Sequence, residues 1–185
     1  MGLVRRSELA HIVRAASKIS GDVDVVIIGS QAILGAYEED DLPETVTLSR
    51  EADIAFWDDI DEQKADSVDG AIGEESSFDE MNGYYAQGVS VTTANLPWGW
   101  KERLVRFSNS STRPGIAWCL EPNDLALAKL AAGRDKDYVY VHALLEDGKL
   151  DADVLIARAP TMTISPLRIR QMTKWIEAQR KGFRS

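Results

Sequence analysis

Two short segments near the N-terminus constrain the fold of this 185-residue chain more than any other feature. Val23–Ile28 is rich in β-branched residues, too short for a helix and ended by Gly29–Ser30, so it predicts a buried strand. The second segment, Ser49–Phe56, carries two acids one residue apart, Glu51 and Asp53. Because side chains alternate along a strand, the two carboxylates lie on one face and repel each other. A hard cation such as Mg²⁺ would relieve that repulsion.

The residues between these two strands suggest a site for an anion. Gln31–Tyr37 predicts a short helix that begins at the Gly29–Ser30 turn. A glycine allows a phosphate to approach the backbone, and the free N–H groups at a helix start favour an anion. The following stretch, Glu38–Thr47, predicts an exposed polar loop.

A lysine in the second half of the chain stands among apolar residues. Pro122 opens and Gly133 closes a predicted helix, Asn123–Ala132, in which Lys129 is surrounded by alanine and leucine. A cation on such a face is costly unless it meets an anion. The residues leave two interpretations open: Lys129 faces an anion, or its aliphatic stem reaches past the helix edge to water.

The next predicted helix begins with alternating charges, from Arg134 to Asp137, and continues to Leu145. Acids in a first helical turn are common because they cap the helix and favour its dipole. Asp137 therefore has a purely structural interpretation as well as a functional one. Arg134 could contact a phosphate, pair with Asp137 or pair with the preceding helix.

Taken in order, these motifs resemble the nucleotidyltransferase (polymerase-β-like) superfamily, over roughly Val23 to Leu145. The segment Pro122–Asp137 resembles the lysine helix and the following basic-acidic motif of the AbiEii and MenT type branch. That branch contains toxins of bacterial and phage-defence toxin–antitoxin systems, together with many uncharacterised members.

The resemblance implies a nucleoside triphosphate and a divalent cation as ligands. Gly29 and Ser30 would hold the β- and γ-phosphates. Glu51 and Asp53 would coordinate Mg²⁺, or Mn²⁺ in its place, bridging the triphosphate.

The resemblance also assigns roles to the lysine helix and the motif after it. Lys129 would contact the triphosphate or a carboxylate of the site, and would offset the negative charge that develops during transfer. Asp137 would orient Lys129 or help to deprotonate the attacking hydroxyl, and Arg134 would touch phosphate.

Two features depart from the family pattern. Twenty residues separate Ser30 from Glu51, a longer connection than is usual. The family usually carries a third acid on the strand before the Pro-x-x-Trp segment, and this chain has Ser90 at the aligned position. Serine does not hold a divalent cation as a carboxylate does, so the sequence leaves two possibilities: one cation held by the acid pair, or a site that binds without chemistry.

The expected architecture is a single α/β (α+β) domain with a nucleotidyltransferase-like mixed sheet flanked by helices. Residues 1–121 would form the α/β core, and residues 122–185 a helical C-terminal part of the same domain. Within the core, residues 75–93 predict a hairpin or meander with strands at Gly83–Tyr85 and Gly88–Thr93. A chain of this length can bury a sizeable core.

Charge is distributed unevenly along the chain, whose net charge is −9. Residues 38–80 contain 17 acids and two bases, whereas residues 154–185 contain seven bases and one acid. A nucleic-acid partner such as tRNA would therefore approach the basic C-terminal helix. The alternative is that the acids are a solvated face balanced by the basic end.

The remaining composition indicates a cytoplasmic protein without a membrane partner. Cys119 is the only cysteine, which excludes an intramolecular disulfide and a cysteine-rich zinc site. No apolar run approaches the length of a membrane span, and the N-terminus lacks the apolar stretch of a signal peptide.

The resemblance therefore implies a Mg²⁺-dependent nucleotidyltransferase that moves a nucleoside monophosphate from an NTP to a hydroxyl acceptor. In the toxin branch that acceptor is a tRNA 3′ end, and a cognate antitoxin protein would be a partner. The contrasting hypothesis is a non-catalytic module on the same fold that binds nucleotide, RNA or a protein.

Overall fold

The sheet is built from five short strands: β1 (Asp24–Ile27), β2 (Glu51–Ala55), β3 (Tyr85–Gly88), β4 (Val105–Phe107) and β5 (Ile116–Cys119). A computed structural model describes residues 4–182 of the chain. The strands lie in the order β3-β2-β1-β5-β4, with β1 at the centre. β1 runs parallel to β5 and antiparallel to β2, and β2 runs parallel to β3. The sheet is therefore mixed, as the sequence predicts.

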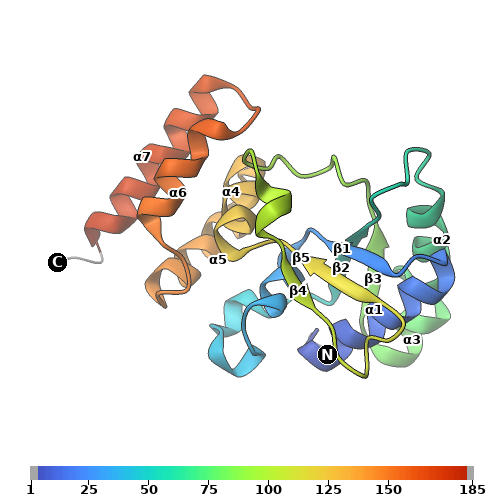
Figure 1. Cartoon of the computed structure of the whole chain (residues 1–185). Helices are drawn as coiled ribbons and strands as arrows, with labels where there is room; N and C mark the ends of the chain where they lie inside the picture. The colour runs from blue at the N-terminus through green and yellow to red at the C-terminus, as the bar shows by residue number, and fades with distance from the viewer. Residues whose placement is uncertain (1–3, 183–185) are drawn as a thin grey trace.

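Helices cover the sheet and extend beyond it (Figure 1). The α-helices are α1 (Arg6–Ser20), α2 (Gln63–Ile72), α3 (Ser77–Asn82), α4 (Pro122–Ala132), α5 (Asp135–Glu146), α6 (Ala152–Arg158) and α7 (Pro166–Gly182). The 3-10 helices are η1 (Ser30–Gly35), η2 (Glu39–Asp41), η3 (Glu44–Val46), η4 (Trp100–Arg103) and η5 (Ala159–Thr161). α1 packs against α2 near the β3 edge, and α6 and α7 lie side by side, projecting away from the sheet.

The central strand owes its position to its apolar residues. Val25, Val26 and Ile27 are fully buried, as expected for a strand covered on both faces. The core continues into α4, whose Leu125, Leu127 and Leu130 are also fully buried. This continuity brings α4 against η1 at the end of β1.

The ends of α4 are fixed by its sequence. The Glu121 side chain caps the helix by accepting the Asp124 N–H, and Pro122 occupies the first turn. Gly133 adopts φ of 70°, the left-handed conformation that glycine favours at a helix C-terminus. The sharp end places α5 directly after α4, so that the start of α5 turns toward the lysine of α4.

The prediction for residues 75–93 is wrong. This region contains α3 and a single strand, β3, and Gly88–Thr93 is not a strand apart from its first residue. α3 forms because Ser76 caps it by accepting the Asp79 N–H and Gly83 ends it with φ of 76°. β3 is an edge strand and its neighbour is β2, which it pairs with in parallel, so no hairpin forms within residues 75–93.

The long connection from β1 to β2 is also more ordered than predicted. The expected helix Gln31–Tyr37 is the 3-10 helix η1, and the expected exposed loop Glu38–Thr47 contains η2 and η3. Val46 is buried, and η3 packs against α5. The insertion therefore packs beside α5.

No helix in residues 4–182 has the length and apolar character needed to cross a bilayer.

Candidate active site

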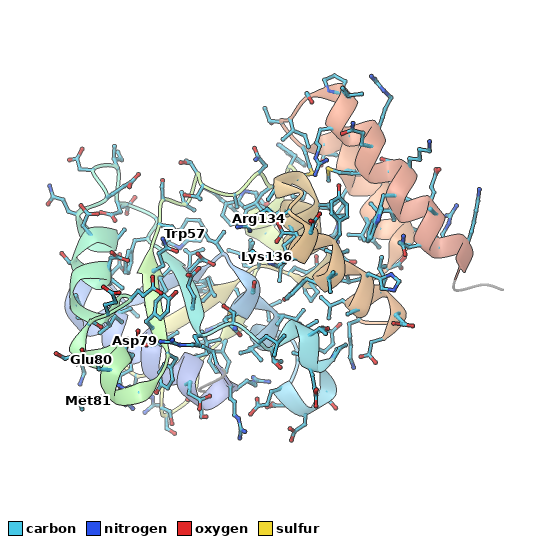
Figure 2. The ribbon with its side chains drawn as sticks, turned by 180° about the vertical axis from the view of Figure 1, so that it is seen from behind. Trp57, Asp79, Glu80, Met81, Arg134 and Lys136 are labelled. Atoms are coloured by element: carbon cyan, nitrogen blue, oxygen red, sulfur yellow. The ribbon has the colours of Figure 1, made fainter. Side chains whose placement is uncertain are left out.

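A cavity of about 780 Å³ lies between the sheet and the helices α4 and α5. It is lined by the end of β1, by β2 and β3, by α4 and by the start of α5, where Figure 2 labels Arg134 and Lys136. The structure brings every predicted site residue to this cavity: Gly29, Ser30, Glu51, Asp53, Lys129, Arg134 and Asp137.

Lys129 points into the cavity from α4. Its Nζ donates to Ser30 Oγ at 2.8 Å and lies 3.4 Å from Asp137 Oδ1. The ammonium also lies 4.3 Å from the centre of the Tyr140 ring. Burial lowers the pKa of Lys129, although the Asp137 carboxylate opposes this effect. Of the two interpretations open from the sequence, the structure selects the lysine that faces an anion.

Asp137 is fully buried at the first turn of α5. Arg134 donates to it through Nε at 2.8 Å and through its backbone N–H at 3.3 Å. Burial acts to raise the pKa of Asp137, but the hydrogen bond from Arg134 and the charge of Lys129 outweigh it, so the pKa is lowered. A carboxylate with these partners is a weak base and a good orienting group for Lys129.

Arg134 keeps most of its side chain accessible while it holds Asp137. Its side chain is 61% exposed, at the mouth of the cavity. Of the alternatives left open by the sequence, pairing with Asp137 is therefore the one that the structure shows. The exposed part of the guanidinium is available to a ligand in the cavity.

Glu51 and Asp53 share one face of β2, between residues whose side chains are fully buried. Burial is the main cause that raises the pKa of Asp53 to about 6. The negative charge of Glu51 and a hydrogen bond between the two side chains add to this effect. On the other side of Glu51, the Tyr85 hydroxyl donates to Oε2 at 2.9 Å. The acids therefore lie close enough to repel each other.

The glycine at the end of β1 makes room for one of these acids. A Cβ on Gly29 would lie 1.5 Å from Asp53 Oδ2, well inside any allowed contact. Only a residue without a side chain lets the carboxylate lie against the backbone here. Gly29 thus connects the Gly29–Ser30 turn, where an anion is expected, to the acid pair.

The donor set at the acid pair suits a hard cation. Mg²⁺ is commonly held by one or two carboxylates, with water and substrate phosphates as the remaining ligands. A dication would also relieve the repulsion that raises the pKa of Asp53. In the described part of the chain, no three His, Cys, Asp or Glu side chains gather as a metal site, so Glu51 and Asp53 would hold the cation without a third acid.

The residue beside the acids on β3 is Gln87, not Ser90. Asp53 is in register with Gln87, and Glu51 is in register with Tyr85. Ser90 lies beyond the end of β3, where its hydroxyl contacts Thr92 Oγ1 at 2.9 Å. Ser90 therefore lies outside the strand on which the third acid is expected, because β3 ends before that residue.

Several residues of the cavity wall were not predicted from the sequence, among them Tyr85, Gln87 and Tyr140. Tyr85 and Gln87 are two apart on β3, a spacing that could have identified a common face. Tyr140 donates from its hydroxyl to the Ser30 carbonyl at 2.8 Å. It lies three residues after Asp137 on α5, the helical spacing of neighbours on one face.

The tryptophans near η4 form a separate cluster. The rings of Trp57 and Trp100 stack with centres 5.7 Å apart, and Lys101 Nζ lies within 5.7 Å of both centres. Trp100 also packs against the core. None of these three side chains lines the cavity.

A buried lysine opposite an acid pair, with a Gly-Ser turn between them, places the chain among the nucleotidyltransferase-like proteins. Residues 7–181 match the model of a family described as nucleotidyltransferase of unknown function (DUF6036), and the chain belongs to this family. No curated protein and no solved structure matches the chain.

Proposed function

We propose that the protein is a Mg²⁺-dependent nucleotidyltransferase that moves a nucleoside monophosphate from an NTP to a hydroxyl acceptor. The observation that carries the proposal is the pairing, across one cavity, of two mutually repelling acids with the Lys129–Ser30 contact. One side of the cavity suits a cation and the other suits phosphate oxygens, as an NTP bound with its metal requires.

The cationic side would hold the β- and γ-phosphates. Ser30 Oγ and Lys129 Nζ already meet at 2.8 Å, and Gly29 leaves the backbone open to a close approach. Arg134 offers the exposed part of its guanidinium at the mouth. These groups would stabilise the charge that develops on the leaving pyrophosphate.

The acid pair would hold the cation beside the α-phosphate. A bound Mg²⁺ would neutralise part of the phosphate charge. Glu51 is oriented by Tyr85, and Asp53 is confined against Gly29, so both carboxylates are positioned before a ligand arrives. Asp137 would keep Lys129 oriented rather than act as the base.

The transfer step conserves all atoms. The acceptor hydroxyl oxygen forms a bond to the α-phosphorus as the bond from that phosphorus to the α,β-bridging oxygen breaks. Pyrophosphate leaves with the bond electrons, and the hydroxyl proton passes to water. The protein's contribution is to align the groups and to stabilise charge.

An RNA acceptor is favoured by the basic surface of α7. Arg170, Lys174 and Lys181 are exposed on this helix, which projects beside α6 (Figure 1). A basic surface of this kind contacts phosphates without reading sequence. We propose a tRNA 3′ end as the first acceptor to test. The corresponding physiological role would be that of a toxin whose activity an antitoxin protein inhibits.

Label transfer tests the proposal directly. The protein is incubated with each α-labelled NTP, Mg²⁺ and total tRNA, beside a Glu51→Ala/Asp53→Ala variant. We expect label on RNA with the native chain and none with the variant. NTP binding without transfer for all four nucleotides would overturn the transferase proposal.

That outcome would favour the second candidate, a binding module without catalysis. The absence of a third acid beside Asp53 in the described chain is the observation that favours it. In that case NTP should still raise the melting temperature, and the double variant should lose this effect.

A further inference from the structure

Gln87 lies beside the acid pair, and its side-chain amide is available to a ligand. Its register partner across the parallel β2–β3 ladder is Asp53, so the two side chains leave the sheet on the same face. Gln87 is exposed and lines the cavity. Within residues 4–182 its amide forms no hydrogen bond.

The two neighbours of β2 give the acid pair two unlike sides. On the β1 side, Asp53 lies against Gly29, next to the Ser30–Lys129 contact. On the β3 side, the acids meet Tyr85 and Gln87. Ser30 and Lys129 therefore lie on the β1 side of the pair. Near Tyr85 the cavity is also lined by Glu74 and by Arg50, whose guanidinium is already paired with Asp79.

The in-line geometry of phosphoryl transfer places the acceptor on the β3 side of the acid pair, opposite the phosphate-binding groups. In phosphoryl transfer the attacking and leaving oxygens are roughly in line through the phosphorus. If pyrophosphate leaves toward Ser30 and Lys129, the attacking hydroxyl arrives from the β3 side. Gln87 is the polar side chain next to Asp53 on that side.

The cavity wall that continues from Gln87 carries no charge. Its next lining residues along the chain are Val89, Thr93, Ala94 and Asn95. A phosphate held there would find no cation from this segment, whereas a sugar with hydroxyl groups would find apolar surface and neutral polar groups. The wall therefore suits the uncharged terminal part of an acceptor.

We propose that Gln87 is the acceptor-contacting residue, whose amide oxygen accepts a hydrogen bond from the attacking hydroxyl. Because the amide is neutral where a carboxylate would complete a three-acid cluster, the site holds one divalent cation instead of two. This inference rests on the proposed nucleotidyltransferase function. It adds the side from which the acceptor enters and the chemical class of its reacting end, a neutral sugar hydroxyl.

The number of bound cations tests whether the neutral side chain of Gln87 limits the site to one cation, and this test does not depend on activity. Mn²⁺ is titrated into the full chain with each α,β-methylene NTP analogue in turn, and bound Mn²⁺ is counted by electron paramagnetic resonance. We expect one bound Mn²⁺ per nucleotide complex in the native protein and two in Gln87→Glu. Two in the native protein, or one in Gln87→Glu, would overturn the inference.

Kinetics test the contact with the acceptor. In the label-transfer assay, Gln87→Ala should raise the KM for tRNA at least tenfold while the Kd for the NTP analogue changes less than twofold. Gln63→Ala, an exposed glutamine on α2 outside the cavity, is the matched control and should change neither constant. An unchanged KM for tRNA in Gln87→Ala would overturn the contact.

The two proposals fail in different ways. If the native protein transfers no label, the proposed function fails, and the Mn²⁺ count still decides whether Gln87 keeps the site at one cation. If the native protein transfers label and Gln87→Ala matches it, only the inference about Gln87 fails.

Discussion

On the helix wall of the cavity, formed by α4 and the first turn of α5, buried opposite charges meet. Lys129 contacts Asp137, which Arg134 also holds, and the pKa of Asp137 is lowered. On the sheet wall, β2 presents two acids to each other, and burial together with Glu51 raises the pKa of Asp53 to about 6. The helix wall is stable as it stands, whereas the sheet wall is stabilised only when a proton or a cation joins it.

The difference separates structure from function. Charge pairs that satisfy each other hold α4 and α5 in place and orient Lys129. Two acids held together without a cationic side chain between them reduce stability, which is the pattern of a ligand site. Removing one acid from each wall should therefore change stability in opposite directions.

Breaking the helix wall should have the largest effect. Asp137→Ala leaves Lys129 buried without its carboxylate, and we expect unfolding free energy to fall by about 3 kcal/mol, as for other broken buried pairs. Urea denaturation measures the change. Asp135→Ala, exposed in the same turn, is the control and should change stability by less than about 0.5 kcal/mol. Equal losses would show that Asp137 acts only as a first-turn acid.

The junction between the walls should come next. Gly29→Ala forces a methyl group into Asp53 Oδ2, and overpacking of this kind costs roughly 2 kcal/mol. Thermal and urea unfolding measure the loss, and Mg²⁺ should raise the melting temperature less than in the native chain. Gly70→Ala on α2 meets open space and should stabilise the protein by up to about 1 kcal/mol. A neutral Gly29→Ala would mean that Asp53 moves freely.

Removing the repulsion between the two acids of the sheet wall should stabilise the metal-free protein. The pKa of Asp53 is raised in the folded state to about 6. Between about pH 4 and 6 the folded protein therefore binds a proton that the unfolded chain does not bind. The free energy of unfolding falls as pH rises through this window, because that proton is lost. Asp53→Asn removes the charge and should gain about 1 to 2 kcal/mol at pH 8, with no corresponding loss between pH 4 and 6.

Chemical denaturation across this pH range measures both effects of Asp53→Asn. Asp69→Asn, an exposed acid on α2, makes the same change in net charge and should keep the native pH dependence. Added Mg²⁺ should stabilise the native chain at pH 8 and have little effect on Asp53→Asn. A destabilised Asp53→Asn at pH 8 would contradict the proposed repulsion.

The smallest effect should come from the support of Glu51. Tyr85→Phe keeps the ring but removes the hydroxyl that donates to Glu51, and we expect a loss of about 1 kcal/mol. Differential scanning calorimetry measures it. Tyr138→Phe is the control, because the Tyr138 hydroxyl makes no hydrogen bond to any residue in 4–182. A gain in stability would indicate that the Tyr85 hydroxyl is strained.

Local patterns in the sequence predicted the elements that carry the site. The strand repeat placed Glu51 and Asp53 on one face, and the Pro122 and Gly133 signals bounded α4 around Lys129. These predictions depend on the geometry of neighbouring residues, which short stretches of chain fix by themselves. The mixed sheet was confirmed, although the region around β3 was not.

Only the tertiary structure decided which distant residues meet. Lys129 and Ser30 are 99 positions apart, and their contact requires α4 to pack on η1. Gln87 stands beside Asp53 because β3 joins the sheet in parallel with β2, instead of pairing with a second strand within residues 75–93 as predicted. Residue spacing determines which face of an element a side chain occupies, but its partners depend on strand order, register and helix packing, which are properties of the whole chain.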